Sequence, residues 1–281
     1  MSAVALRSGI GAAGYLVCFG GIVRRELLRF LNQTGRFFSA LVRPLVWLFI
    51  FAAGFRSVLG LSITPPYETY VLYDVYVVPG LAAMIQLFAG MQSSLSMVYD
   101  REVGSMRLLL TSPFPRWSLL FAKLAAGVVV SLVQVYVFIA VAQLWGTDLP
   151  HLGLLAALPA FVLVGLMLGA MGLFLSSLVR QLENFASVMN FVIFPLFFAS
   201  SALYPLWRIR ESSELLYRIC LANPFNHAVE LVRFALYLRV EPVALGVVVC
   251  TTALFFFLAV VAYDPGRGVM GRRGGPQEAP A

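Results

Sequence analysis

Six long apolar runs constrain this chain more than any other feature of its sequence. They are Phe38 to Gly54, Tyr73 to Val98, Trp117 to Trp145, Leu152 to Val179, Phe185 to Leu206 and Val243 to Tyr263. A helix needs roughly 20 apolar residues to cross a hydrocarbon core of about 30 Å. The runs show no strand-like alternation of polar and apolar residues, which disfavours a β-barrel. The sequence therefore predicts an all-α integral membrane protein with six transmembrane helices.

Composition supports the same class. Hydrophobic residues make up 60% of the 281 residues and charged residues only 12%, a balance that does not suit a soluble domain of this size. The three cysteines, Cys18, Cys220 and Cys250, are odd in number and imply no disulfide framework. The chain therefore needs a membrane to accommodate its apolar surface.

The positions of lysine and arginine predict which side of the membrane each loop faces. If the helices alternate from Phe38, most basic residues fall on one side: those before the first run, those between Arg101 and Lys123, Arg180, and those after Tyr263. Short basic loops stay in the cytoplasm, so we expect both termini to be cytoplasmic. The net charge of +7 is then mainly a topology signal, and no nucleic-acid partner is expected.

The chain divides into three predicted regions. Residues 1–37 form a cytoplasmic N-terminus in which Ile22 to Phe37 carries an apolar stripe opposite a row of arginines. This pattern favours an interfacial helix, and the alternative is the basic flank of the first span. Residues 38–263 form the transmembrane domain, and residues 264–281 are expected to be a disordered cytoplasmic tail because they show no periodicity.

A short charged segment, Tyr99 to Arg116, separates the second and third runs. Asp100 is a candidate N-cap and Glu102 falls in the first helical turn, while Pro113 and Pro115 end the helix. About three turns result, with one apolar face for the protein and another face for the cytoplasm. We therefore interpret this segment as a docking element for a soluble partner.

The polar segment from Trp207 to Pro242 precedes the last run and is predicted to lie on the outer side. Its pattern predicts two short outer helices, Ser212 to Leu221 and Pro224 to Arg239. Asn223 is the expected N-cap of the second helix, with Pro224 at its first position. Such helices would lie at the outer interface or dip into it.

The sequence shows no catalytic constellation and no metal site. His227 and Glu230 lie one helical turn apart, but a metal would need another ligand, and a solvated ion pair of Glu230 with Arg233 is the favoured interpretation. The interiors of the runs hold almost no charged residues, which disfavours ion-coupled transport. No GxxxxGK[ST] motif is present, so any ATP that powers this chain is bound by a separate subunit.

Two further patterns on the runs each leave two interpretations open. Gly165 and Gly169 have the GxxxG spacing that allows close helix approach, although glycine is also common in membrane helices generally. The fifth run carries aromatic residues that line a substrate path or, as we favour, pack against lipid or the core: Phe191, Phe194, Phe197 and Phe198.

Three motifs fall in a recognisable order: DREVGSMRLLLTSP after the second run, Lys123 near the start of the third, and NPFNHAVELVRFAL before the last. With them, the chain from about Ile22 to Tyr263 resembles an ABC-2-type permease, the six-helix membrane subunit of ABC exporters. In this family the first motif is a coupling helix that enters a groove on the ATPase subunit. The resemblance assigns ATPase coupling to Asp100, Arg101, Glu102, Gly104, Ser105 and Arg107, and outer-helix positions to Asn223, Pro224, Glu230 and Arg233.

The resemblance also implies partners, a location and a mechanism. Family members pair two permeases with two ATPases, so we expect a homodimer, with a paired second permease as the alternative, in the lipid of the plasma membrane, which is the inner membrane in bacteria. ATP and Mg²⁺ would bind to the partner ATPase and not to this chain. The coupling helix would pass motion to a path formed by the first, second and fifth spans. The alternative is a non-transporting scaffold or sensor that docks a cytoplasmic partner, and the sequence does not choose a substrate.

Overall fold

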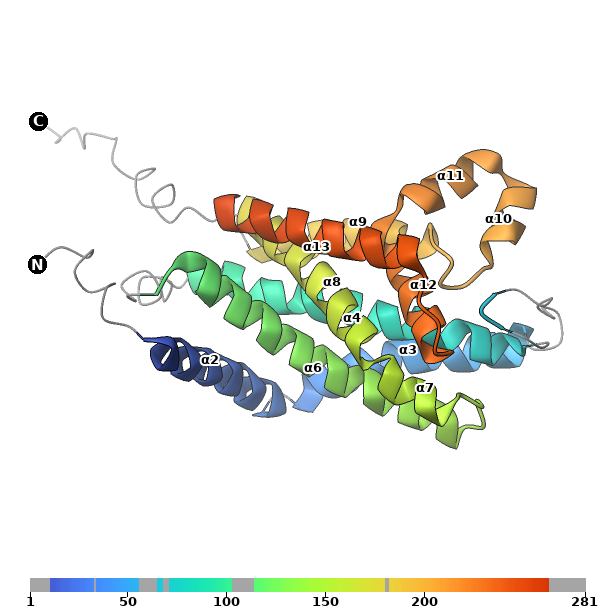
Figure 1. Ribbon diagram of the computed structural model, residues 1–281, viewed down its shortest axis with the longest axis horizontal. Coiled ribbons are helices and arrows are strands. Elements are labelled where there is room, and N and C mark those ends of the chain that lie inside the picture. The colour runs from blue at the N-terminus through green and yellow to red at the C-terminus, as the bar shows by residue number, and fades with distance from the viewer. Residues whose placement is uncertain are drawn as a thin grey trace, which may run out of the picture.

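The computed structural model describes residues 11–32, 34–55, 65–67, 71–102, 114–179 and 182–262. Long helices run side by side along the molecule, and a group of shorter helices lies at one end (Figure 1). We call this the α12 end and the opposite end the α2 end. The helices are α2 (Ala12–Asn32), α3 (Thr34–Phe55), α4 (Tyr73–Glu102), α6 (Arg116–Leu144), α7 (His151–Ala156), α8 (Leu158–Leu178), α9 (Leu182–Phe198), α10 (Leu206–Ser212), α11 (Glu214–Ala222), α12 (Pro224–Leu236) and α13 (Pro242–Ala262).

Helix α4 is the central helix of the bundle. It packs against α3, α6, α8, α9 and α12. The most apolar stretch of α4 is 83% buried inside the protein, whereas the corresponding stretch of α13 is only 17% buried. The polar side chains of Gln86 and Ser94 on α4 are therefore surrounded by protein. Helix α13, by contrast, offers most of its apolar surface to the surroundings.

Four helices in the described part of the chain are long and apolar enough to cross a membrane: Tyr73–Tyr99, Arg116–Leu144, Leu158–Leu178 and Pro242–Ala262. They correspond to four of the six predicted runs. Helices α3 and α9 correspond to the other two, and their strongly apolar segments are shorter, Leu41–Ile50 and Ser187–Phe198. The chain is thus a multi-pass membrane protein with apolar helices.

Small residues allow the central helices to approach closely. A Cβ atom on Gly90 of α4 would lie 2.9 Å from the backbone nitrogen of Gly169 on α8. A Cβ atom on Gly169 would in turn lie 2.5 Å from a methyl carbon of Leu124 on α6. The prediction that Gly165 and Gly169 permit close helix approach is confirmed, because Gly165 also faces the Gln86 side chain on α4.

The fourth predicted run is wrong in its first turns. Leu152 to Ala156 belong to the separate short helix α7, and α8 begins at Leu158. Pro159 in the first turn of α8 has no N–H to donate, so the chain starts a new helix there instead of continuing α7.

The fifth predicted run is wrong at its far end. Helix α9 ends at Phe198, and a tight turn leads to α10, which begins at Leu206 after Pro205. The Asn223 side chain donates hydrogen bonds to the carbonyl oxygens of Leu196 and Ala199, at 2.7 and 2.6 Å, and so caps the end of α9. Helix α10 was not predicted.

The N-terminal helix is longer than predicted and differently placed. Helix α2 starts at Ala12 instead of Ile22, and α3 starts at Thr34 instead of Phe38. Helix α2 packs lengthwise against α6, beginning with a contact between the rings of Tyr15 and Phe114 at 5.2 Å. Figure 1 shows the two helices running in the same direction at the α2 end.

The two predicted outer helices are present with shifted ends. Helix α11 starts at Glu214, because the Ser213 hydroxyl accepts the Leu216 N–H at 3.3 Å as an N-cap. Helix α12 ends at Leu236 instead of Arg239. Leu238 has a positive φ of 60°, and the Arg239 N–H returns to the Phe234 carbonyl at 3.0 Å, which is the Schellman arrangement that closes a helix.

Candidate functional site

The predicted docking segment begins at the α2 end of α4. Asp100, Arg101 and Glu102 lie in the last turn of α4, which is helical without a break from Tyr73 to Glu102. Asp100 is therefore not an N-cap, and that prediction is wrong: the second run and the start of the docking segment form one helix. Gly104, Ser105 and Arg107 lie outside the described residues, so their predicted coupling roles stay predictions.

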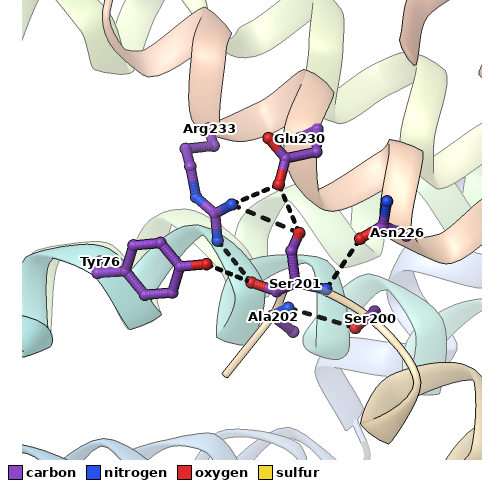
Figure 2. Close-up of polar contacts among 7 residues, drawn as sticks. All are labelled: Tyr76, Ser200, Ser201, Ala202, Asn226, Glu230 and Arg233. Carbon is purple, nitrogen blue, oxygen red and sulfur yellow. Dashed lines mark hydrogen bonds and ion pairs between the residues drawn. The ribbon is translucent and has the colours of Figure 1, made fainter. Parts of the chain in front are cut away.

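At the α12 end, five side chains gather around the turn after α9. We call Tyr76, Ser201, Asn226, Glu230 and Arg233 the Ser201 cluster (Figure 2). Tyr76 comes from the first turn of α4, whereas Asn226, Glu230 and Arg233 come from α12. The cluster thus joins three segments that are distant in sequence.

Every polar group of Ser201 is used in this cluster. Its N–H donates to Asn226 Oδ1 at 2.9 Å, and its hydroxyl donates to Glu230 Oε1 at 2.5 Å. Its carbonyl oxygen accepts from the Tyr76 hydroxyl at 3.0 Å and from Arg233 Nη2 at 2.7 Å. Ser201 is therefore fixed to α4 and α12 at the same time (Figure 2).

Arg233 is the central charge of the cluster. Its side chain is only 3% exposed, and its Nη1 pairs with Glu230 Oε1 at 2.5 Å. The guanidinium carbon lies 4.1 Å from the centre of the Tyr76 ring, a cation–π distance. Burial alone would lower the pKa of Arg233, but Tyr76, Glu230 and Tyr67 raise it above its ordinary value, so the guanidinium remains charged.

The predicted pairing of Glu230 with Arg233 is confirmed, but its predicted exposure to solvent is wrong. Glu230 and Arg233 do pair, but the pair lies between α12, α4 and the turn, with the Glu230 side chain 18% exposed. A buried charged pair is stable only when its remaining donors and acceptors are also satisfied. Ser201 and the Tyr76 ring supply most of those contacts here, whereas the buried Arg233 Nε has no hydrogen-bond partner within the described residues.

Asn223 has the capping role that the sequence predicts, and a second role that it does not. Its Oδ1 accepts the Phe225 N–H at 3.0 Å and caps α12, as expected. Its amide nitrogen caps the end of α9, as described above. Pro224 follows as the first residue of α12. One side chain thus caps the end of α9 and the start of α12.

The turn after α9 also lies directly on α4. The Tyr73 hydroxyl donates to the Leu203 carbonyl at 2.8 Å. A Cβ atom on Gly80 would overlap the backbone oxygen of Ala202, so only glycine permits this approach. The residues from Ser201 to Leu203 are consequently held against the first two turns of α4.

Sequence reasoning missed Tyr73, Tyr76, Ser201 and Asn226. One signal was available on α12, where Asn226, Glu230 and Arg233 repeat at four and three residues and so form one polar stripe beside the apolar face. Residues at these spacings are neighbours on the helix surface, so they can share one polar partner. No local signal marks the partners on α4, because they are far away in sequence.

His227 does not join Glu230 in a site. The His227 Nε2 lies 2.9 Å from the Leu221 carbonyl, whereas Glu230 contacts Ser201 and Arg233. Within the described ranges, no group of three or more histidine, cysteine, aspartate or glutamate side chains could hold a metal ion.

The aromatic residues of α9 divide into two sets. Phe197 is 1% exposed and its ring meets Trp47 of α3 at 5.9 Å. Phe191, Phe194 and Phe198 are exposed, at 79%, 43% and 45%. The preferred packing role holds for Phe197, while the other three form an open aromatic face beside α3, on which Ile50 is also exposed.

Comparison with known proteins shows which sequences this chain resembles. The family model described as ABC-2 type transporter matches residues 18–237. The transport permease ycf38 of Porphyra purpurea is 26% identical over 221 residues, covering 76% of this chain and 72% of that protein. The ycf38 permease of Cyanophora paradoxa is 27% identical over 219 residues, with the same coverage. The multidrug ABC transporter permease YbhR of Escherichia coli strain K12 is 30% identical over 170 residues, 59% of this chain and 45% of that protein.

Proposed function

The chain belongs to the ABC-2 type transporter family and is the membrane permease subunit of an ABC transporter, and from this premise we propose that it is an exporter driven by a separate ATPase chain. The ATPase would bind ATP and Mg²⁺, and it would contact the docking segment of this chain. The contact residues we propose are Asp100, Arg101, Glu102, Gly104, Ser105 and Arg107.

The observation that carries this mechanism is the continuity of α4. Its 30 residues correspond to a helix about 45 Å long. Asp100 to Glu102 lie in its last turn, and Tyr76 of the Ser201 cluster lies in its first. A displacement of the docking segment would therefore move the turn after α9 and α12 as well, because the Ser201 cluster ties them to α4.

Pro79 lies inside α4, between Tyr76 and Gly80, and it removes one backbone hydrogen bond. The helix from Gly80 to Glu102 would move as one body and would act on the turn through the close contact of Gly80 with Ala202. Tyr76 lies on the other side of Pro79 and would follow through the remaining turn of α4.

We propose six membrane crossings, with α3 and α9 as the two beyond the four candidate spans. Their 22 and 17 residues correspond to about 33 and 25 Å, which is comparable with a hydrocarbon core of about 30 Å. The positive-inside rule then places the α2 end and both termini in the cytoplasm. The compartment would be the plasma membrane, the inner membrane in a bacterium.

We also propose that two copies of the chain pair through the face formed by α3 and α9. Phe191, Phe194 and Phe198 of α9 and Ile50 of α3 are exposed apolar side chains. Between two permeases such a face would form the wall of the export path. Crosslinking of Phe191→Cys to itself in membranes would support this arrangement, whereas crosslinking of Phe257→Cys on α13 in its place would contradict it.

The coupling proposal is tested with the purified complex of this chain and its ATPase in proteoliposomes. Glu102→Ala and Gly104→Trp are compared with Glu211→Ala, which removes an exposed acid on α10. We expect both docking variants to weaken complex formation or stimulation of ATP hydrolysis roughly tenfold, the effect of losing a charge-assisted contact. Glu211→Ala should behave as wild type.

Two results would overturn the proposal in different ways. Unchanged coupling in both docking variants would remove the assignment of the segment. A stable complex whose hydrolysis never responds to the permease would instead favour the scaffold or sensor alternative.

A further inference from the structure

Arg43 is a charged residue halfway along two packed helices. It is the tenth of the 22 residues of α3, inside the strongly apolar segment Leu41–Ile50. Its guanidinium carbon lies 4.2 Å from the centre of the Phe88 ring on α4, a cation–π distance. Phe88 is 15 residues after Tyr73 and 11 before Tyr99, the two ends of the α4 candidate span. The charge is therefore held near the middle of that span and does not reach towards either end.

The protein does not cover this charge. Arg43 is an exposed residue, and within the described residues it forms no ion pair with a carboxylate. A charged side chain at the depth of the hydrocarbon faces a bundle interior, a water-filled cavity or an ionic partner, and it indicates a functional site. If α3 crosses the membrane, as proposed above, Arg43 needs an anion at this depth.

A second copy of the chain does not supply that anion from its apolar runs. Apart from Asp74 in the first turn of α4, the six runs contain no aspartate and no glutamate. Asp74 is 14 residues before Phe88, or about 21 Å along the helix. Lipid phosphates lie in the polar interface, outside the hydrocarbon. An anion that moves through the membrane remains, and a permease carries such molecules.

Aromatic side chains lie at the level of Arg43. Helices α3 and α9 both pack against α4 and run towards the α12 end (Figure 1). Trp47 of α3 and Phe198 of α9 share one level, because their ring centres are 5.8 Å apart. One helical turn earlier on these helices are Arg43 and Phe194. The Phe194 ring stacks on Phe198 at 6.2 Å, and both rings are exposed. An apolar molecule with an anionic group therefore matches this face.

We propose that the exported molecule is an amphipathic anion, that Arg43 binds its anionic group, and that Phe194 and Phe198 contact its apolar part. The planar guanidinium donates several hydrogen bonds, which match the oxygens of a carboxylate, sulfonate or phosphate. The contact with Phe88 holds the guanidinium in place. This inference rests on the proposed export function and adds the chemical class of its substrate.

The test is binding of fluorescent probes that share a pyrene body and differ in charge: anionic pyrenebutyrate, neutral pyrenebutanol and cationic pyrenebutylamine. The purified full chain is placed in phosphatidylcholine nanodiscs, and binding to empty nanodiscs is subtracted. We expect the wild type to bind the anion roughly tenfold more tightly than the alcohol, as one charge-assisted hydrogen bond would give, and to bind the cation most weakly.

Variants show whether Arg43 causes this preference for the anion. Arg43→Gln should abolish the preference, whereas Arg43→Lys keeps the charge and should retain part of it. Arg218→Gln makes the same charge change at an exposed position on α11 and should leave the preference unchanged. If Arg43→Gln does not fold, Phe194→Glu places a carboxylate at an exposed position on the level of Arg43. That carboxylate should pair with Arg43 and abolish the preference, and the uncharged Phe194→Gln should keep it.

Three results would overturn the proposal. They are equal binding of the anion and the alcohol by the wild type, a preference that survives in folded Arg43→Gln, and loss of the preference in nanodiscs that also contain dioleoyl phosphatidylglycerol. The last result would show that a lipid anion occupies the site. Probe binding needs no ATPase, so its failure is distinct from failure of the coupling proposal, which is measured by ATP hydrolysis of the complex.

Discussion

Arg233→Met should strongly destabilise the α12 end of the protein. The substitution keeps a long side chain but removes the guanidinium that contacts Glu230, Ser201 and the Tyr76 ring. Glu230 then keeps only the Ser201 hydroxyl as a partner in this cluster. A carboxylate that has lost its cation within a mostly buried site is the main source of the cost.

The size of the effect follows from the burial of the two partners. Removing one member of a fully buried ion pair costs about 3–5 kcal/mol. Arg233 fits this case at 3% exposure, but the Glu230 side chain is 18% exposed and keeps some contact with solvent. We therefore expect a loss of about 3 kcal/mol in the free energy of unfolding, at the lower end of that range. Glu230→Gln in the same chain removes the orphaned charge, and the double variant should recover at least about 1 kcal/mol relative to the sum of the singles.

The measurement is equilibrium unfolding of the purified chain in mixed micelles, followed by circular dichroism. Arg218→Met is the control, because the ion pair of Arg218 with Glu214 on α11 has side-chain exposures of 75% and 52%. A surface pair of this kind contributes about 0–1 kcal/mol. The Ser201 cluster does not stabilise the fold if Arg233→Met lowers the free energy of unfolding no more than Arg218→Met does. The same conclusion follows if the loss in the double variant equals the sum of the losses from Arg233→Met and Glu230→Gln.

Three further predictions concern single contacts. Gly153→Ala on α7 should lower the free energy of unfolding by about 1–3 kcal/mol, since its new Cβ would overlap the backbone oxygen of Leu236. The control is Gly246→Ala, which should leave the free energy of unfolding unchanged because no atom lies within 4 Å of its new Cβ. Equal effects of the two substitutions would refute the close contact between Gly153 and Leu236. Asn223→Ala should lower the free energy of unfolding by about 2 kcal/mol, because it removes the caps of both α12 and α9. Asn223→Asp keeps the α12 cap alone and should recover part of that loss, and thermal unfolding of the two variants measures the difference. Phe191→Ala should leave the unfolding free energy of the single chain nearly unchanged, because that side chain is 79% exposed, but it should lower the dimer fraction seen by light scattering.

The helical regions could be predicted from the sequence, but several of their ends could not. The last run was predicted as Val243 to Tyr263 and is observed as Pro242–Ala262, because its apolar residues are bounded by local polar and proline signals. The end of the fifth run was missed, since the residues after Phe198 are as apolar as those before it. That helix ends where it does because Asn223, from a different helix, binds its last carbonyl groups.

The candidate site was predictable only in part. The sequence pointed to Asn223, Glu230 and Arg233 as residues of an outer helix, and the i, i+3 spacing correctly paired Glu230 with Arg233. It assigned that pair to solvent because charged residues are rarely buried without partners. The partners exist, but Tyr76 and Ser201 lie 125 residues apart, and no local pattern relates them.

The sequence by itself determined that this chain is a membrane protein of apolar helices, because runs of that length and composition are stable only where lipid or protein covers them, and a helix satisfies its own backbone hydrogen bonds there. It also carried the family motifs, which are local. Only the tertiary structure decided that Arg233 is buried, that Asn223 caps two helices, and that the Arg43 guanidinium lies over the Phe88 ring of α4. Burial and hydrogen bonding of a polar side chain depend on neighbours brought together by folding, and those neighbours are not adjacent in the chain.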